Sequence, residues 1–155
     1  MAQFTFELDG VLRQRKNVEQ LAQRQAAIAQ RTLTELQDQL RRLDESVKGV
    51  TADVRDNHLT GPINVSFITA HRRYIVNMER AVLDLARQIA DAQQKVNQAQ
   101  AILLEAAKQR KGIEKLRERQ LERWTASEAK KENQNLDEAG MQIAFTNLTA
   151  APAEH

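Results

Sequence analysis

The residues in this sequence that could bind metals or carry protons are few and scattered. The chain has no cysteine and three histidines, His58, His71 and His155. None of the histidines has a second histidine or a carboxylate four residues away in a usual metal-binding motif. Glycine-rich phosphate loops and nucleophile elbows are also missing. We therefore expect a protein that is not an enzyme, with no catalytic residue, metal site, cofactor or small-molecule substrate.

A basic cluster is the strongest chemical feature of the sequence. It is interleaved with Glu114, Glu118 and Glu122, and its members are Lys108, Arg110, Lys111, Lys115, Arg117, Arg119 and Arg123. Such a cluster is either a solvated helix face or a docking surface for an acidic or carbonyl-rich partner. Nucleic acid is not an expected partner, because acidic residues are interleaved and no groove-reading motif is present.

The single tryptophan, Trp124, follows this cluster directly. Two interpretations of it stay open. Exposed tryptophans are enriched at interface hot spots, so Trp124 could bind another protein. It could instead cover the open end of a helix pair together with Phe4 and Phe6.

The composition predicts the elements that carry these residues. Five glycines, two prolines and an aromatic content of 4% leave few turn residues and little material for a globular core. Alanine, leucine, glutamine, glutamate, lysine and arginine dominate, which is typical of long helices and coiled coils. We expect an all-α protein.

The first helix is predicted over residues 5–57, with Thr5 as its N-cap and acidic residues in its first turn. Steps of four and three residues mark a coiled-coil stripe at Leu36, Leu40, Leu43, Val47, Val50 and Val54. Traced backward, the stripe reaches Leu33, Ala29, Ala26 and Ala22. Val18, Leu21 and Ile28 lie one position off it, which suggests a local change of supercoil.

A turn is predicted over residues 58–63, where Asn57 could take a left-handed C-cap and Gly61-Pro62 cannot continue a helix. A second helix follows over residues 64–139, capped by Asn64 or Ser66. Its stripe is Ile68, His71, Ile75, Met78, Val82, Leu85, Ile89, Ala92, Val96, Ala99, Leu103 and Ala106. We interpret His71 as a partly exposed member of this stripe rather than a ligand.

The short linker predicts an antiparallel coiled-coil hairpin. It spans about 20 Å, whereas the first helix is about 75 Å long, so a parallel return is impossible. If Val54 lies opposite Ile68, Leu8 lies opposite Glu114, and the second helix continues without a partner. Residues 1–140 then form one domain. Residues 141–155 are expected to be a disordered tail, although Met141, Ile143 and Phe145 alternate like a short strand.

Three stretches together resemble one family. They are FTFELDGVLRQRKNVEQLAQRQAAIAQ at the start, YIVNMERAVLDL after the turn, and LRERQLERW followed by LDEAG. Their order and the off-centre turn are similar to the FliJ family of flagellar type III export proteins. The resemblance covers Phe4 to about Gly140, where this chain has glycine in place of the usual alanine.

The resemblance implies a two-helix coiled coil similar to the central stalk of rotary ATPases. Members of the family bind the hexameric flagellar export ATPase, promote its assembly and activity, and link it to the cytoplasmic part of the membrane export gate. Export chaperones are a further partner class. The chain is accordingly expected in the cytoplasm, at the inner membrane beneath the flagellum. The absence of a basic segment followed by an apolar run at the start agrees with this location.

Family positions indicate two binding surfaces. The ATPase surface would include Leu116, Arg119, Gln120, Glu128, Leu136, Asp137 and Glu138, and the basic cluster adds Arg117, Arg123 and Trp124. The gate surface would include Gln39, Leu43, Tyr74, Met78 and Ala81. Leu43 and Met78 also belong to the predicted stripes.

Two alternatives remain. The stalk proteins of injectisomes look similar, so the chain could serve that system instead. A chain of this kind could also be a self-assembling coiled-coil scaffold, in which the unpaired part of the second helix binds another copy.

Overall fold

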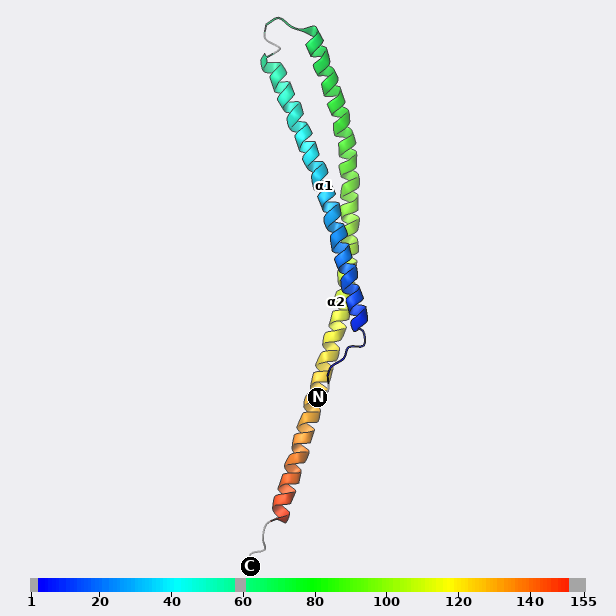
Figure 1. Ribbon diagram of the computed structural model, residues 1–155, viewed down its shortest axis with the longest axis vertical. Helices are drawn as coiled ribbons and strands as arrows, with labels where there is room; N and C mark the ends of the chain where they lie inside the picture. Colours follow the sequence, from blue (N-terminus) through cyan, green and yellow to red (C-terminus); the bar gives the residue numbers. More distant parts are fainter. Residues whose placement is uncertain (1–2, 58–60, 151–155) are drawn as a thin grey trace, which may run out of the picture. The chain divides into compact units, whose positions relative to one another are not determined.

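The computed structural model describes residues 3–57 and 61–150 of the chain. Two helices account for almost all of them: α1, Asp9–Asn57, and α2, Val65–Thr149 (Figure 1). No strand occurs within these ranges. The prediction of an all-α protein with two helices is therefore confirmed.

The start of α1 differs from the prediction, since the helix begins at Asp9 and Thr5 is not its cap. The Asp9 amide donates to the carbonyl of Phe6 at 3.2 Å, and the Leu12 amide donates to the carbonyl of Leu8 at 2.9 Å. Phe6, just before the helix, is only 5% exposed. Burial of this large side chain outweighs the small gain from one more helical turn.

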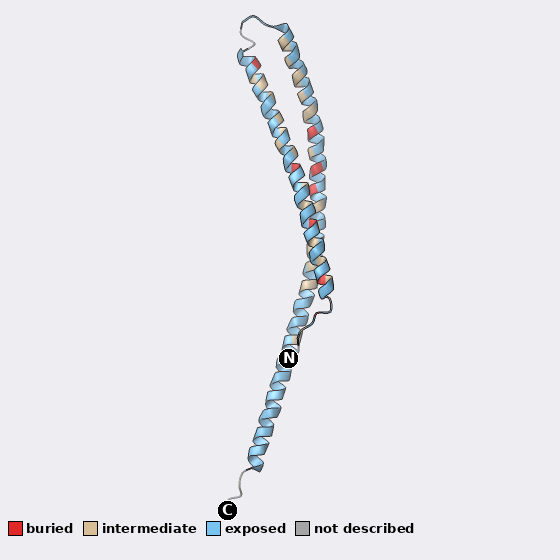
Figure 2. Ribbon diagram, viewed as in Figure 1, coloured by how far each residue is buried: buried red, intermediate tan, exposed pale blue. Residues whose placement is uncertain are grey.

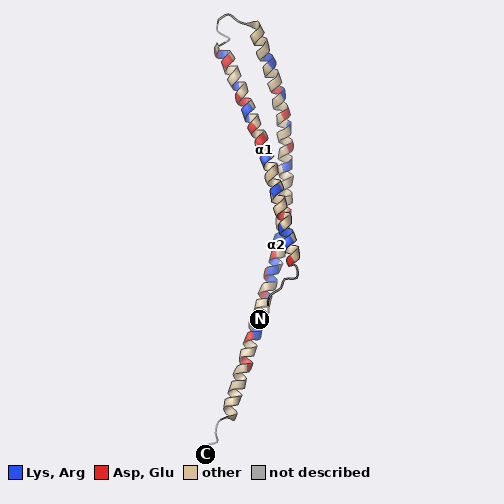
Figure 3. Ribbon diagram, in the orientation of Figure 1, with Lys and Arg blue, Asp and Glu red and all other residues tan. Residues whose placement is uncertain are grey.

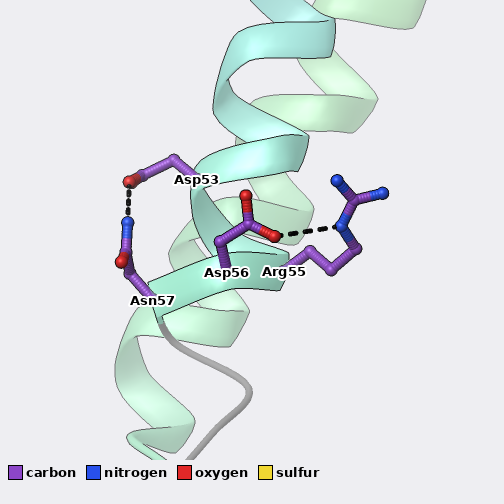
Figure 4. Close-up of polar contacts among 4 residues, drawn as sticks. All are labelled: Asp53, Arg55, Asp56 and Asn57. Carbon is purple, nitrogen blue, oxygen red and sulfur yellow. Dashed lines mark hydrogen bonds and ion pairs between the residues drawn. The ribbon is translucent and has the colours of Figure 1, made fainter.

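The other end of α1 lies at Asn57, as predicted, but without a left-handed cap. No described residue other than glycine has a positive φ. The Asn57 side chain donates instead to Asp53 Oδ1 at 2.7 Å, one turn back in the helix (Figure 4). Arg55 Nε donates to Asp56 Oδ1 at 3.2 Å in the same turn.

The residues before α2 include the predicted cap. Gly61 has a φ of 99°, a conformation that suits glycine, and His58 to Thr60 lie outside the described residues. The Asn64 side-chain oxygen accepts hydrogen bonds from the amides of Ser66 at 3.1 Å and Phe67 at 3.2 Å. Asn64, rather than Ser66, is therefore the N-cap, and the helix begins one residue later than predicted.

The end of α2 corrects the predicted tail. The helix extends to Thr149, so residues 141–149 are neither disordered nor a strand. A glycine within a helix costs about 1 kcal/mol relative to alanine, which is too little for Gly140 to end α2. Thr146 and Thr149 donate their hydroxyls to the carbonyls of Gln142 and Phe145, one turn earlier. Residues 151–155 lie outside the described part of the chain.

The chain divides into two compact units. Unit 1 contains Met1–Lys16 and Lys108–His155, and unit 2 contains Asn17–Ala107. Each unit combines a part of α1 with a part of α2. In unit 2 the two parts run side by side as an antiparallel helical hairpin (Figure 1).

The core of unit 2 is a narrow contact between the helices. Leu33 is 3% exposed and packs with Ala92 and Val96, and the half-buried residues around them are Ala29, Leu36 and Ile89. The predicted register places Leu33 opposite Ile89, which belongs to this cluster. The antiparallel register was therefore predicted to within about one helical turn.

The two predicted stripes are the sides along which the helices pack (Figure 2). All twelve positions of the α2 stripe, including His71, are buried or half-buried, and so are the positions of the α1 stripe from Ala22 to Val54. Val18, Leu21 and Ile28, by contrast, are 42%, 56% and 66% exposed. These three residues are not a shifted part of the stripe but a separate exposed row.

The burial pattern shows how little of the chain is a core. Among the described residues no polar or charged side chain is buried, and no side chain is less than 2% exposed. Stability therefore depends on a single row of contacts between α1 and α2.

Over the described residues, neither helix contains a stretch long and apolar enough to cross a membrane.

Leu33→Ala tests this dependence. Truncating a buried leucine removes apolar contacts and leaves a cavity, so we expect a loss of about 2–3 kcal/mol in the free energy of unfolding. Leu21→Ala on the same helix is the matched control, and it should change that energy by less than about 0.5 kcal/mol. Urea titration followed by far-ultraviolet circular dichroism measures both. Equal losses in the two variants would contradict the assigned core.

Candidate functional site

The aromatic residues at the start of the chain pack against α2 in unit 1. The rings of Phe4 and Trp124 have centroids 5.9 Å apart and planes tilted by 54°. Phe6 is buried nearby in sequence, and so is Leu12, at 6% exposed. In Figure 1 the segment before α1 runs beside α2. Of the two interpretations of Trp124, the structure supports the one in which it covers the end of the helix pair.

Polar contacts join the first two turns of α1 to α2 in the same unit. Arg117 Nε lies 3.8 Å from Asp9 Oδ1, and Arg15 Nη1 donates to Gln109 Oε1 at 2.5 Å. Both contacts are exposed, where an ion pair contributes at most about 1 kcal/mol. They therefore add little to the stability of the packing between α1 and α2 in unit 1.

The basic cluster is divided between bound and solvated side chains. Arg110 donates to Glu114 at 2.6 Å in a partly buried pair, and Arg117 contacts Asp9. The other members are exposed and form no ion pair within the described part of the chain: Lys108, Lys111, Lys115, Arg119 and Arg123. Most of the cluster's charge is therefore available to another molecule.

Helix geometry separates the predicted ATPase residues into two faces. At 100° per residue, one face carries Leu116, Arg119, Gln120 and Arg123, all exposed. A second face carries Arg117, Trp124 and Glu128. Asp9 and Phe4 contact the first two of these, and Glu128 pairs with Lys131 at 2.9 Å. The first face makes no such contact and is therefore the better surface for docking. We call it the free face.

Beyond Glu128, α2 has no described contact with the N-terminal segment. Every described residue after Glu128 is exposed, including Leu136, Asp137 and Glu138 from the predicted set (Figure 2). We call residues 125–149 the distal segment. A lone helix is marginal in water, so the distal segment is the least stabilised part of α2 within the described chain.

Sequence reasoning missed an apolar face at the end of this segment. Met141, Phe145 and Leu148 are 67%, 69% and 78% exposed, and Ala144 lies between them. Their spacing of i, i+3, i+4 and i+7 is that of an amphipathic helix, a signal present in the sequence but interpreted as a tail. Residues 139–149 carry no charged side chain (Figure 3).

The predicted gate residues belong to unit 2 and lie on one flank of the hairpin. Gln39 is exposed, and Leu43, Tyr74, Met78 and Ala81 are half-buried. Helix geometry places Gln39 on α1 and Tyr74 and Ala81 on α2 on the same flank of the contact between the helices. Leu43 and Met78 are stripe positions, half-buried rather than fully covered. The five residues can therefore form one surface.

A hollow of about 420 Å³ lies on the opposite flank of this part of the hairpin. Its lining includes Val47, Met78, Val82 and Leu83. Asp44 at its edge accepts from Lys48 Nζ at 2.8 Å, and this hydrogen bond raises the pKa of the exposed Lys48 ammonium. The hollow does not include Tyr74 or Ala81 and shares only Met78 with the predicted gate surface.

Within residues 3–57 and 61–150, no group of three His, Cys, Asp or Glu side chains lies close enough to hold a metal ion.

The family model for the flagellar FliJ protein matches residues 4–149. The chain belongs to this family. Membership of the FliJ family and the YscO-like fold support a stalk protein of flagellar or type III export. The match extends nine residues beyond the predicted end of the family pattern at Gly140 and reaches the last residue of α2.

The fold of this FliJ-family chain is also seen in a solved structure. A YscO homolog, CT670 from Chlamydia trachomatis, has a TM-score of 0.62 and 18% sequence identity, covering 96% of this chain and 99% of that one. At this identity the likeness shows the fold alone. No match is found among curated proteins.

Phe4→Ala should release Trp124 to water. Trp124 is the single tryptophan of the chain, so tryptophan fluorescence reports on the surroundings of this ring. Loss of the ring pair, worth about 1 kcal/mol, should shift the emission to the red. Phe145→Ala, at a ring that is 69% exposed, is the control and should leave the spectrum unchanged. An identical spectrum for Phe4→Ala and the unaltered chain would contradict the packing.

Proposed function

We propose that this protein is a non-enzymatic stalk that binds the hexameric flagellar export ATPase through the end of α2. In this role it promotes assembly and activity of the ring and links the ring to the cytoplasmic part of the export gate. Export chaperones are a further partner class. The site of action is the cytoplasmic side of the inner membrane at the base of the flagellum.

The observation that carries this proposal is the exposed end of α2. The distal segment has no partner among the described residues, and next to it lies the free face with Arg119 and Arg123. Its last turns add the apolar face with Met141 and Phe145. A basic face and an apolar face on one unpaired helix suit insertion into a protein channel that supplies both kinds of contact.

Stimulation of the ATPase follows from mass action. A helix that contacts several subunits of the ring at once binds the assembled hexamer more tightly than separate subunits. Binding then shifts the equilibrium toward the ring, which is the active form. The stalk itself does not need to catalyse any reaction to have this effect.

The gate-binding part of the proposal rests on unit 2. Tyr74 and Ala81 on α2 and Gln39 on α1 share a flank, with half-buried Leu43 and Met78 between them. This arrangement leaves the ATPase and gate residues in different units, so both partners can bind one chain.

The likeness to a YscO homolog keeps the injectisome as a second candidate system. Both systems would use the same fold. Rescue of export in a flagellar stalk deletion, but not in an injectisome stalk deletion, would assign the chain to the flagellum.

Reversing Arg119 and Arg123 to glutamate tests the ATPase surface. Arg117 is left intact because it contacts Asp9. If the free face binds the ring, we expect about a tenfold or greater loss of ATPase stimulation with unchanged helicity. The assay measures hydrolysis by the purified flagellar export ATPase as the stalk is titrated.

The matched control for this test reverses Arg24 and Arg31, two exposed arginines of unit 2. It changes the net charge by the same amount and should preserve stimulation. Full stimulation by the Arg119 and Arg123 variant, or equal losses in both variants, would argue against a specific surface at the end of α2.

Tyr74→Ala tests the gate surface. Removing this half-buried ring should weaken binding to the purified cytoplasmic part of the gate by about tenfold, because aromatic residues dominate interface energies. Calorimetry measures the affinity, and ATPase stimulation by the same variant is the control. Parallel loss of both activities would show that the two surfaces are not separate.

A further inference from the structure

The exposed row on α1 in unit 2 repeats with coiled-coil spacing. Its positions alternate by three and four residues and are Val18, Leu21, Gln25, Ile28 and Thr32. Leu21 and Ile28 are 56% and 66% exposed, although a leucine and an isoleucine at these steps are typical of a helix that packs against another. The contact with α2 uses a different side of α1, so this row has no partner within the described part of unit 2.

A groove between the helices adjoins this row. It has a volume of about 310 Å³, and its lining is Gln25, Ile28, Ala29, Thr32, Ala92 and Lys95. Two alanines form its floor, so the groove can admit side chains from a third helix. The Thr32 hydroxyl already donates to the Ile28 carbonyl at 3.1 Å, which leaves that hydroxyl satisfied when water is removed.

The side of the groove that α2 forms also carries an exposed apolar residue further along the helix. Ile102 lies seven residues after Lys95, on the same side of α2, and is 56% exposed. The row on α1 and the wall on α2 therefore face one channel along unit 2, with apolar side chains on both edges.

Charge on the edges of the channel defines the partner. Arg24 and Arg31 flank the α1 row at positions that pair with a neighbouring helix in a coiled coil. They and Lys95 form no ion pair within the described residues. Two carboxylates on this flank, Glu35 and Asp91, lie one helical turn from Arg31 and Lys95, toward the end of the channel at the turn. The centre of the channel is therefore basic.

We propose that this channel binds one amphipathic helix of another protein, with apolar residues at heptad spacing and glutamates or aspartates beside them. The apolar stripe fills the groove over Ala29 and Ala92, and the acidic flank pairs with Arg24, Arg31 and Lys95. Gln25, a polar residue within the row, sets the register of the bound helix. This role goes beyond the proposed function and uses neither the ATPase nor the gate residues.

The channel also lies on the same flank as the predicted gate residues. Gln39 follows Thr32 by seven residues on α1, and Ala81 precedes Lys95 by two heptads on α2. A helix bound in the channel would therefore lie next to that surface, and separate variants are needed to distinguish the two.

The test uses the full-length chain and two designed peptides of about 21 residues, three heptads each, with isoleucine and leucine at the apolar positions. One peptide has glutamate at all flanking positions, which also prevents it from pairing with itself, and the other has lysine there. Calorimetry measures their binding to the chain. We expect the acidic peptide to bind at least about tenfold more tightly than the basic peptide.

Variants assign the binding to the channel. Leu21→Glu with Ile28→Glu should weaken binding of the acidic peptide by about tenfold or more. The control, Leu83→Glu with Leu104→Glu, changes two leucines that are each 61% exposed on the opposite flank, and it should bind like the unaltered chain. Tyr74→Ala should also bind like the unaltered chain. ATPase stimulation should survive the Leu21 and Ile28 changes, so the outcome is independent of the proposed function.

Three results would overturn the proposal. The first is failure of the acidic peptide to bind the unaltered chain. The second is equal weakening by the channel and control variants. The third is a dimer of the chain alone in sedimentation that becomes a monomer on Leu21→Glu with Ile28→Glu, since a second copy would then occupy the channel.

Discussion

The packing of α1 against one side of α2 is the interaction on which the rest of the structure depends. A helix satisfies its own backbone hydrogen bonds, but in water its stability comes mainly from the burial of its apolar stripe. Here α1 provides that burial from Ala106 back to Ile68 of α2, and the segment before α1 extends it to Trp124. After Glu128 nothing within the described chain provides it, so the distal segment has only its own helical hydrogen bonds and neighbouring side chains to stabilise it.

Sequence reasoning predicted the packed part well because the packing itself has a period. The stripe residues from Ile68 to Ala106 recur at steps of three and four, and every one is buried or half-buried. The cap at Asn64 was predicted for a similarly local reason, since its side chain bonds to amides two and three residues away. Rules that consider only residues close together in the sequence were sufficient to predict these features.

The features that were missed depend on contacts between residues distant in the sequence, or on a small difference in free energy between two local conformations. Thr5 is an ordinary cap by local rules, but docking of Phe4 on Trp124 draws this segment out of the helix, and those residues are 120 positions apart. The end of α2 was placed ten residues early because Gly140 and the apolar alternation suggested an interruption. For Val18, Leu21 and Ile28 the period was noticed, but it could equally mark a bent stripe or a second exposed one.

Hydrogen exchange tests most directly whether the distal segment is a helix that lacks an internal partner. Mass spectrometry of the free chain should show slow exchange over the core around Leu33 and Ala92 and fast exchange over residues 125–149. Addition of the hexameric export ATPase should slow exchange in residues 125–149 and leave the core unchanged. Slow exchange of this segment in the free chain, or no slowing when the ATPase is added, would contradict the account.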